Sequence, residues 1–231
     1  MIKKINKNLV LNSIVLVPEI TKGMKSIGSK ALIPVDKNKC IIDYQIEYLQ
    51  KKYKNNHITI ITGFEKEKIQ KRTHKYKNIN YADNPDFEST NQGKALSVYL
   101  KKYNPQNLLI ISNGILLREE LELNECESTI FVLQKHNSDY TIGLNKTEKN
   151  TSYLFYDFPT PWAECVFLNR IAIDTLNEKL KGKNISQMFL FEIINYLIDN
   201  NCTFKTQTIK NQNICKITTI KNTKKAKSFY V

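Results

Sequence analysis

The stretch VLVPEITKGMKSIGSKALIPV, residues 15–35, indicates how the chain begins to fold. An apolar run ends at Val17, a polar loop follows, and a second apolar segment starts after Lys30. This layout is typical of a phosphate-binding loop that follows the first strand of an α/β domain. Such loops need glycines, because only a glycine backbone can approach a phosphate closely. No G-x-G spacing occurs between Val17 and Lys30, so the stretch keeps the length of such a loop without its chemistry.

The rest of the first half alternates between two kinds of pattern. Apolar residues at helical spacing predict helices, and short β-branched runs closed by Gly or Asn predict strands. This order predicts an α/β fold with a doubly wound, mostly parallel sheet and helices on both faces. The expected elements are a strand over 13–17, a helix over 40–53, a strand over 57–63, a helix over 65–76, a strand over 78–85, a helix over 91–103 and a strand over 107–114.

The second half is richer in strands, which predicts an added β-rich part. A helix is expected over 186–201, with Ser186 as its N-cap, and a terminal helix over 222–231. No linker or repeat interrupts the chain, so we predict one domain over 1–231 with a basic N-terminal tail over 1–12. The strands are expected over 128–134, 139–145, 152–158, 164–169, 203–209 and 213–220.

Composition restricts the setting more than the activity. The 231 residues carry a formal net charge of +13, which would suit an anionic partner such as nucleic acid. Arginine, the usual side chain for base and phosphate recognition, occurs only at positions 72, 118 and 170, so an abundance of solvated lysine explains the charge equally well. The five cysteines form no C-x-x-C pair, and no apolar run approaches a membrane span, which favours a cytoplasmic protein.

Several stretches in order resemble one family, the bacterial sugar-phosphate and choline-phosphate nucleotidyltransferases. The resemblance covers nearly the whole chain, and the ordered set is more specific than any single motif. The stretches are SKALIPVDKNKCIIDYQIEYLQKK (29–52), ITIITGFEKEKI (58–69), NINYADNPDFESTNQGKALSVYL (78–100), NLLIISNGILL (107–117) and CTFKTQTIKNQNICKITTIKNTKKAKSF (202–229).

The resemblance implies a nucleotidyltransferase domain, in which a nucleoside triphosphate is coupled to a phosphorylated sugar or choline with release of pyrophosphate. In this family the protein positions the reactants and neutralises their charge, with the help of Mg²⁺. The family's first loop reads L-A-A-G-x-G-S-R-M, and residues 16–24 align with it. Glu19 and Thr21 stand at the two glycines, and Gly23 stands at the arginine. At 4 Å, the repulsion between Glu19 and one phosphate charge costs about 1 to 4 kcal/mol.

The positions that hold the metal in the family also depart from the pattern. The Asp of the Gly-Asp pair aligns with Ile115, and the E-I-D motif aligns with Lys216-Ile217-Thr218. Isoleucine cannot ligate a hard cation. We therefore expect no catalytic residue, metal site or cofactor, with Mg²⁺ required only if the chain is active after all. A rebuilt metal site would need two of five other carboxylates to converge, namely Asp83, Asp86, Glu88, Asp157 and Glu164. The residues that would remain from nucleotide or anion binding are Lys22, Lys30, Asn84, Asn91 and Gly114.

Three hypotheses follow. The first is a catalytically inactive protein that acts as a structural or regulatory subunit, with other protein chains as partners, either beside an active relative or in a virus particle. Its candidate contact surface is a basic face over residues 51–77. The second is a divergent active enzyme that makes a CDP-choline-type or NDP-sugar-type product. The third is a basic nucleic-acid-binding module.

Overall fold

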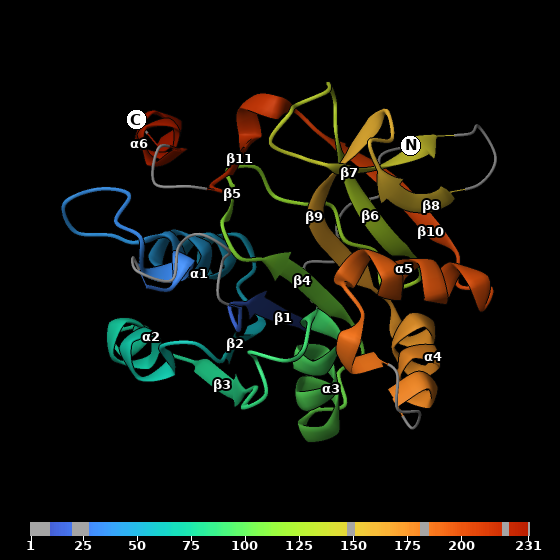
Figure 1. The fold of residues 1–231 in the computed structure, drawn as a ribbon, viewed down its shortest axis with the longest axis horizontal. Coiled ribbons are helices and arrows are strands. Elements are labelled where there is room, and N and C mark those ends of the chain that lie inside the picture. Colours follow the sequence, from blue (N-terminus) through green and yellow to red (C-terminus); the bar gives the residue numbers. More distant parts are fainter. Residues whose placement is uncertain (1–9, 20–27, 147–150, 181–184, 219–221, 231) are drawn as a thin grey trace.

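The computed structural model describes residues 10–19, 28–146, 151–180, 185–218 and 222–230. Its centre is a nine-stranded sheet with the path β10-β6-β9-β4-β1-β2-β3. Strands β1, β2, β3 and β4 run parallel, whereas β9 runs antiparallel between β4 and β6 (Figure 1). The path consists of β1 (Leu11–Leu16), β2 (Asn56–Thr62), β3 (Ile79–Asp83), β4 (Leu108–Ser112), β6 (Ser128–Leu133), β9 (Thr160–Leu168) and β10 (Phe204–Ile209).

Four further strands extend this framework. The hairpin of β7 (Ile142–Lys146) and β8 (Thr151–Tyr156) joins the sheet through β9. A separate antiparallel pair is made by β5 (Ile115–Leu117) and β11 (Ile214–Lys216), which brings the ends of two distant segments together. The doubly wound, mostly parallel sheet with an added β-rich second half is therefore confirmed.

The helices cover both faces of the sheet, as predicted. Residues alternate along β1, so that Ile14 and Leu16 enter one core and Val15 enters the other. The first core lies under α3, α4 and α5, and the second lies under α1 and α2 (Figure 1). The helices are α1 (Ile41–Lys52), α2 (Lys66–Thr73), α3 (Gln92–Lys102), α4 (Arg170–Leu180), α5 (Leu190–Asp199) and α6 (Thr223–Tyr230), with short 3-10 turns η2 (Lys30–Leu32), η3 (Ile185–Gln187) and η4 (Asn211–Asn213).

The predicted start of the helix over 186–201 is wrong. The helix α5 begins at Leu190, its N-cap is Phe189, and Ser186 lies in the preceding 3-10 turn. The carbonyl of Ser186 accepts a hydrogen bond from Asn91 N at 2.9 Å, and the Met188 carbonyl accepts one from Gly93 N at 2.9 Å. The segment before α5 therefore supports the first turn of α3 instead of beginning a helix.

Other elements also differ from the sequence prediction. Residues 11 and 12, assigned to the basic tail, are the first two residues of β1. The strand predicted over 213–220 ends at Lys216, and residues 219–221 lie outside the described part. Helix α4 was not predicted, although the buried side chains of Ala172, Ile173 and Leu176 have helical spacing.

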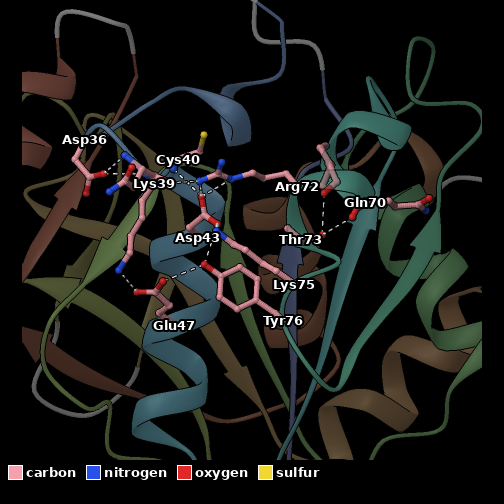
Figure 2. A network of polar contacts seen from close by, with 12 residues as sticks. Asp36, Lys39, Cys40, Asp43, Glu47, Gln70, Arg72, Thr73, Lys75 and Tyr76 are labelled. Atoms are coloured by element: carbon pink, nitrogen blue, oxygen red, sulfur yellow. Dashed lines mark hydrogen bonds and ion pairs between the residues drawn. The ribbon is translucent and has the colours of Figure 1, made fainter.

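A buried carboxylate joins α1 to α2, as Figure 2 shows. Asp43 is fully buried and accepts a hydrogen bond from Cys40 N at 2.7 Å, which closes a capping box at the start of α1. It also forms ion pairs with Arg72 Nη2 at 2.6 Å and Lys75 Nζ at 2.8 Å, and it accepts a hydrogen bond from the Tyr76 hydroxyl at 2.8 Å. Burial alone would raise the pKa of the Asp43 carboxyl, but these donors together hold it below its ordinary value.

No helix in the described ranges is long and apolar enough to cross a lipid bilayer.

Candidate functional site

The sheet changes winding direction between β1 and β4. From β1 the chain moves outward through β2 and β3, and then returns to place β4 on the other side of β1. The carboxyl ends of parallel strands at such a switch point form the crevice where open α/β sheets bind ligands. The end of β1 leads to Glu19 here, and the end of β4 leads to Gly114.

Two of the predicted site residues meet in this crevice. Gly114 has a φ of +87°, and a Cβ there would lie 3.0 Å from Cδ of Lys30 and 2.6 Å from the Ile217 carbonyl oxygen. The Lys30 ammonium donates to the Asn113 carbonyl at 3.4 Å. Burial lowers the pKa of the Lys30 ammonium group, an effect that the nearby carboxylate of Glu164 opposes. Lys30 therefore points into the crevice and is partly withdrawn from solvent.

Glu164 reaches the same place through an irregular strand. It lies within β9 with a φ of +53°, a conformation that costs an ordinary residue about 1–2 kcal/mol. The pairing of β9 with β6 shifts register here, between Ile130 and Val132. The indole Nε1 of Trp162 donates to the Cys165 carbonyl at 3.0 Å across the irregularity. The bulge turns the Glu164 carboxylate toward the crevice.

Lys216 is the ion-pair partner of Glu164. Its ammonium group makes a short ion pair with the Glu164 carboxylate, and the two side chains are 11% and 21% exposed. The same ammonium lies 5.1 Å from the ring centre of Tyr140, a cation–π distance. Lys216 is the Cα partner of Ile115 in the β5–β11 ladder. The cation thus stands beside a position where the resemblance implies a metal ligand.

Glu19 is the second carboxylate of the crevice. Burial raises the pKa of its carboxyl, and Glu164 raises it further, while Lys30 and a hydrogen bond from Gln92 act in the opposite direction. Its Oε1 atom is buried without a hydrogen-bond partner among the described residues. Two carboxylates and two ammonium groups therefore share this crevice. The four residues Glu19, Lys30, Glu164 and Lys216 are called the charge cluster below.

The metal positions do not fit Mg²⁺. Ile115 is 1% exposed and packs in the core, while its carbonyl accepts a hydrogen bond from Gln45 at 3.0 Å. The hydroxyl of Thr218 donates to Asn222 at 3.0 Å. Within the described ranges, no three His, Cys, Asp or Glu side chains gather as a metal site would require. Mg²⁺ needs oxygen ligands free of competing cations, and the two carboxylates nearest this place both face lysines.

The other predicted nucleotide contacts are engaged in local structure. Asn84 is 1% exposed; its Nδ2 donates to Thr90 at 3.2 Å and its Oδ1 accepts from Asp86 N at 3.2 Å. Asn91 stands at the N-cap position of α3 without a capping bond, and its side chain donates to the Gln187 carbonyl at 2.6 Å. The predicted contact at Lys22, with Thr21 and Gly23, lies outside the described residues.

The possible substitute carboxylates behave differently from one another. Asp83 pairs with Lys66 at 2.9 Å and Asp86 pairs with Lys94 at 2.7 Å, so both belong to surface ion pairs. Of these carboxylates, only Glu164 enters the crevice, where it lies near Glu19. The sequence analysis considered Glu19 only as a charge that repels phosphate. Gln92 was missed altogether, and no sequence signal distinguishes it from other polar residues at the start of a helix.

The predicted basic face is partly neutralised by the fold. Arg72 and Lys75 pair with Asp43, Lys66 with Asp83, and Lys68 with Glu65. The exposed lysines of this region that make no ion pair among the described residues are Lys51, Lys54, Lys71 and Lys77. These four residues are called the lysine cluster below.

Comparisons with known proteins support the fold and nothing narrower. No family model matches the chain, and no curated protein matches it. Solved structures do match over nearly the whole length. The CTP:phosphocholine cytidylyltransferase of Streptococcus pneumoniae has a TM-score of 0.77 at 16% identity, covering 96% of this chain and 100% of its own.

Two further neighbours agree with the first. A putative glucose-1-phosphate thymidylyltransferase from Bacillus anthracis has a TM-score of 0.78 at 11% identity, covering 94% of both chains. The inositol-1-phosphate CTP transferase of T. maritima has a TM-score of 0.71 at 12% identity, covering 96% of this chain and 95% of its own. The resemblance seen in the sequence is thus confirmed at the level of structure, and the chain has the nucleotidyltransferase fold.

Proposed function

We propose that this chain is a catalytically inactive protein of the nucleotidyltransferase fold that serves as a structural or regulatory subunit of a larger assembly. It would act in the cytoplasm or, if the chain is viral, in a virus particle. The observation that carries the proposal is the charge cluster. A crevice that binds a triphosphate needs positive charge that the protein itself leaves uncompensated.

The charge cluster provides no such surplus. Lys216 is paired with Glu164, and Lys30 lies within the electrostatic reach of both Glu164 and Glu19. A triphosphate entering here would have to displace carboxylates from lysines and bring its own negative charge beside them. The residues at the metal positions offer no cation site to offset that repulsion. The lysines of the charge cluster are balanced by its carboxylates, which favours a fold retained for its surface.

The first test is a pyrophosphate-release assay. The protein is incubated with CTP, UTP, dTTP or ATP, with phosphocholine or a sugar 1-phosphate as acceptor, and with Mg²⁺ or Mn²⁺. We expect no release above a protein-free control, while an active cytidylyltransferase of the same fold gives a signal in parallel. Release that depends on both nucleotide and acceptor, and that Lys30→Ala abolishes, would overturn the proposal in favour of a divergent enzyme.

The second test addresses the subunit role. Gentle purification from the native source, followed by mass spectrometry, should recover the protein in an oligomer or with stoichiometric partner chains. A protein that emerges as a lone monomer would contradict the subunit role. Co-purifying nucleic acid that is lost steeply as salt rises would instead favour the binding-module hypothesis.

A further inference from the structure

We propose that copies of this chain associate head to tail, with an aromatic face on β8 and α5 of one copy against the lysine cluster of the next. The proposal names a partner for the subunit role and rests on that role. It is carried by two surfaces on elements that lie on different sides of the molecule, with β8 and α5 on one side and α1 and α2 on the other (Figure 1).

The aromatic face has two sets of rings in contact, one on β8 and the following residues and one between β8 and α5. Tyr153 and Phe155 have ring centres 6.1 Å apart, and Phe155 lies 5.3 Å from Phe158. Tyr156 lies 5.6 Å from Phe191, which in turn lies 6.1 Å from Phe189. Phe155 is 47% exposed and Tyr156 is 59% exposed, so large rings remain in contact with water. Exposed apolar groups that gather in this way usually mark a contact surface. The face consists of Tyr153, Phe155, Tyr156, Phe158, Phe189 and Phe191.

The segments that carry this face lack positive side chains, although Lys146 of β7 and Lys179 of α4 lie beside them. Residues 151–169 and 185–199 contain none of the 35 lysines and arginines of the sequence. They do contain Asp157 and Asp199, which are exposed, and Glu192, which is half-buried. In a chain of net charge +13, a second, equally basic copy meets less repulsion at this surface than at one rich in lysine.

The exposed rings of β8, and not its backbone edge, are what this surface offers to a second copy. The Asn195 side chain donates to the Leu154 carbonyl at 2.9 Å and accepts from Leu154 N at 2.8 Å. These two bonds occupy both backbone polar groups of Leu154 in the manner of a neighbouring strand. Pairing of β8 with a strand of another chain is thereby hindered, so the exposed rings are the part left to bind.

The lysine cluster supplies the matching partner. Lys51 lies in the last turn of α1 and Lys54 lies two residues beyond its end, while the Gln50 side chain of α1 donates to the Lys77 carbonyl at 2.9 Å. A lysine over an aromatic ring gains about 0.5 to 2 kcal/mol, depending on how much water is excluded. The chain already uses this contact internally, with Lys179 4.5 Å from the ring centre of Tyr196 on α5.

The placement of the two surfaces determines the kind of assembly. Figure 1 shows α1 and α2 on one side of the molecule and β8 with α5 on the other. Each copy therefore has both ends free after a first contact, so that association continues into rings or filaments and does not stop at a symmetric dimer.

The experiment uses two variants of the full chain. The aromatic-face variant carries Phe155→Ser and Tyr156→Ser, and the lysine-cluster variant carries Lys51→Glu, Lys54→Glu, Lys71→Glu and Lys77→Glu. A matched control carries the same charge change at four exposed lysines elsewhere, Lys101→Glu, Lys135→Glu, Lys210→Glu and Lys227→Glu. Circular dichroism and thermal melts establish that each variant is folded. Sedimentation velocity at low and high salt then gives the size distribution.

We expect the unmodified protein and the control to form oligomers that grow with concentration and shrink with salt. Each interface variant alone should be monomeric, and an equimolar mixture of the two should form a dimer and nothing larger, because one intact junction remains. An unmodified protein that is monomeric throughout overturns the proposal. Oligomers that survive in the lysine-cluster variant overturn it as well, since they require a different interface. Either of these sedimentation results would refute the head-to-tail interface without changing the outcome of the pyrophosphate assay. Measurable pyrophosphate release would instead refute the proposal that the chain is inactive, without changing the size distribution.

Discussion

The Lys216 ammonium group and the Glu164 carboxylate form an ion pair near the switch point of the sheet, although they are 52 residues apart in the chain. Glu164 reaches this position through a bulge in β9, and Lys216 reaches it from the strand that pairs with Ile115. Both therefore depend on irregular or peripheral parts of the sheet. The two charges neutralise each other, so neither is left unpaired for a ligand.

The backbone strain at Glu164 can be measured apart from the ion pair. Glu164→Ala and Glu164→Gly both remove the carboxylate, but only glycine adopts a φ of +53° without steric cost. We expect the glycine variant to be more stable than the alanine variant by about 1 kcal/mol. The free energy of unfolding from urea titrations provides the comparison. Equal stabilities would mean that residue 164 does not hold this conformation in solution.

The missing metal carboxylate cannot simply be restored. Because Ile115 is 1% exposed in the core, Ile115→Asp brings a carboxylate into an apolar environment, where the cation opposite it in the ladder, Lys216, is already paired with Glu164, and should destabilise the protein by about 3 kcal/mol or more. Ile115→Val, the size control, should cost about 1 kcal/mol. Differential scanning calorimetry with and without Mg²⁺ checks both. A stable Ile115→Asp variant whose melting temperature rises with Mg²⁺ would show that the position still belongs to a metal site.

Asp43 should dominate the acid sensitivity of the fold. Asp43→Asn leaves Arg72 and Lys75 without their shared carboxylate and should cost about 3 kcal/mol. Glu47→Gln is the matched control, since Glu47 also accepts from Tyr76 but is 36% exposed, and it should cost under about 1 kcal/mol. Chemical unfolding measures both changes.

Asp43 also predicts how the stability of the fold changes with pH. The pKa of the Asp43 carboxyl is lower in the folded protein than in the unfolded chain, so its contribution is complete above the unfolded value of about 4. It is lost progressively as the pH falls from there through the folded pKa. The Asp43→Asn variant should therefore lose less stability than the unmodified protein between neutral pH and acid. Parallel losses in the two proteins would contradict the assignment.

Gly114 should tolerate no side chain, because its φ of +87° combines with a carbonyl 2.6 Å from any Cβ. Gly114→Ala should destabilise the protein by about 2 kcal/mol or more. Gly28→Ala is the control, since Gly28 has a φ of +91° but a Cβ there meets the movable Glu65 side chain, and it should cost about 1 kcal/mol. Comparing the melting temperatures of the two variants separates the cost of a positive φ from the cost of the steric clash with the Ile217 carbonyl. Equal melting temperatures would mean that the Ile217 carbonyl moves aside.

Local sequence patterns were enough to predict the sheet, the burial of both its faces and the loss of the nucleotide loop. Alternation along β1 sends Ile14 and Val15 to opposite cores, and that pattern is local, so it can be read without a structure. The absence of a G-x-G loop and the presence of Ile115 at a metal position are equally local. The start of α5 was misjudged because the hydrogen bonds that keep Ser186 out of the helix come from α3, almost one hundred residues earlier.

The side chains that fill the crevice could not be predicted in this way, because contacts between distant segments bring them together. No spacing in the sequence places Glu19 near Glu164, or assigns Lys216 to Glu164 and Arg72 to Asp43. Those contacts depend on strand order, on one bulge and on the docking of α2 against α1. Local patterns specify which side of an element is buried, because burial depends on periodicity. Which charges meet there depends on how distant elements are brought together, and that is a property of the assembled fold alone.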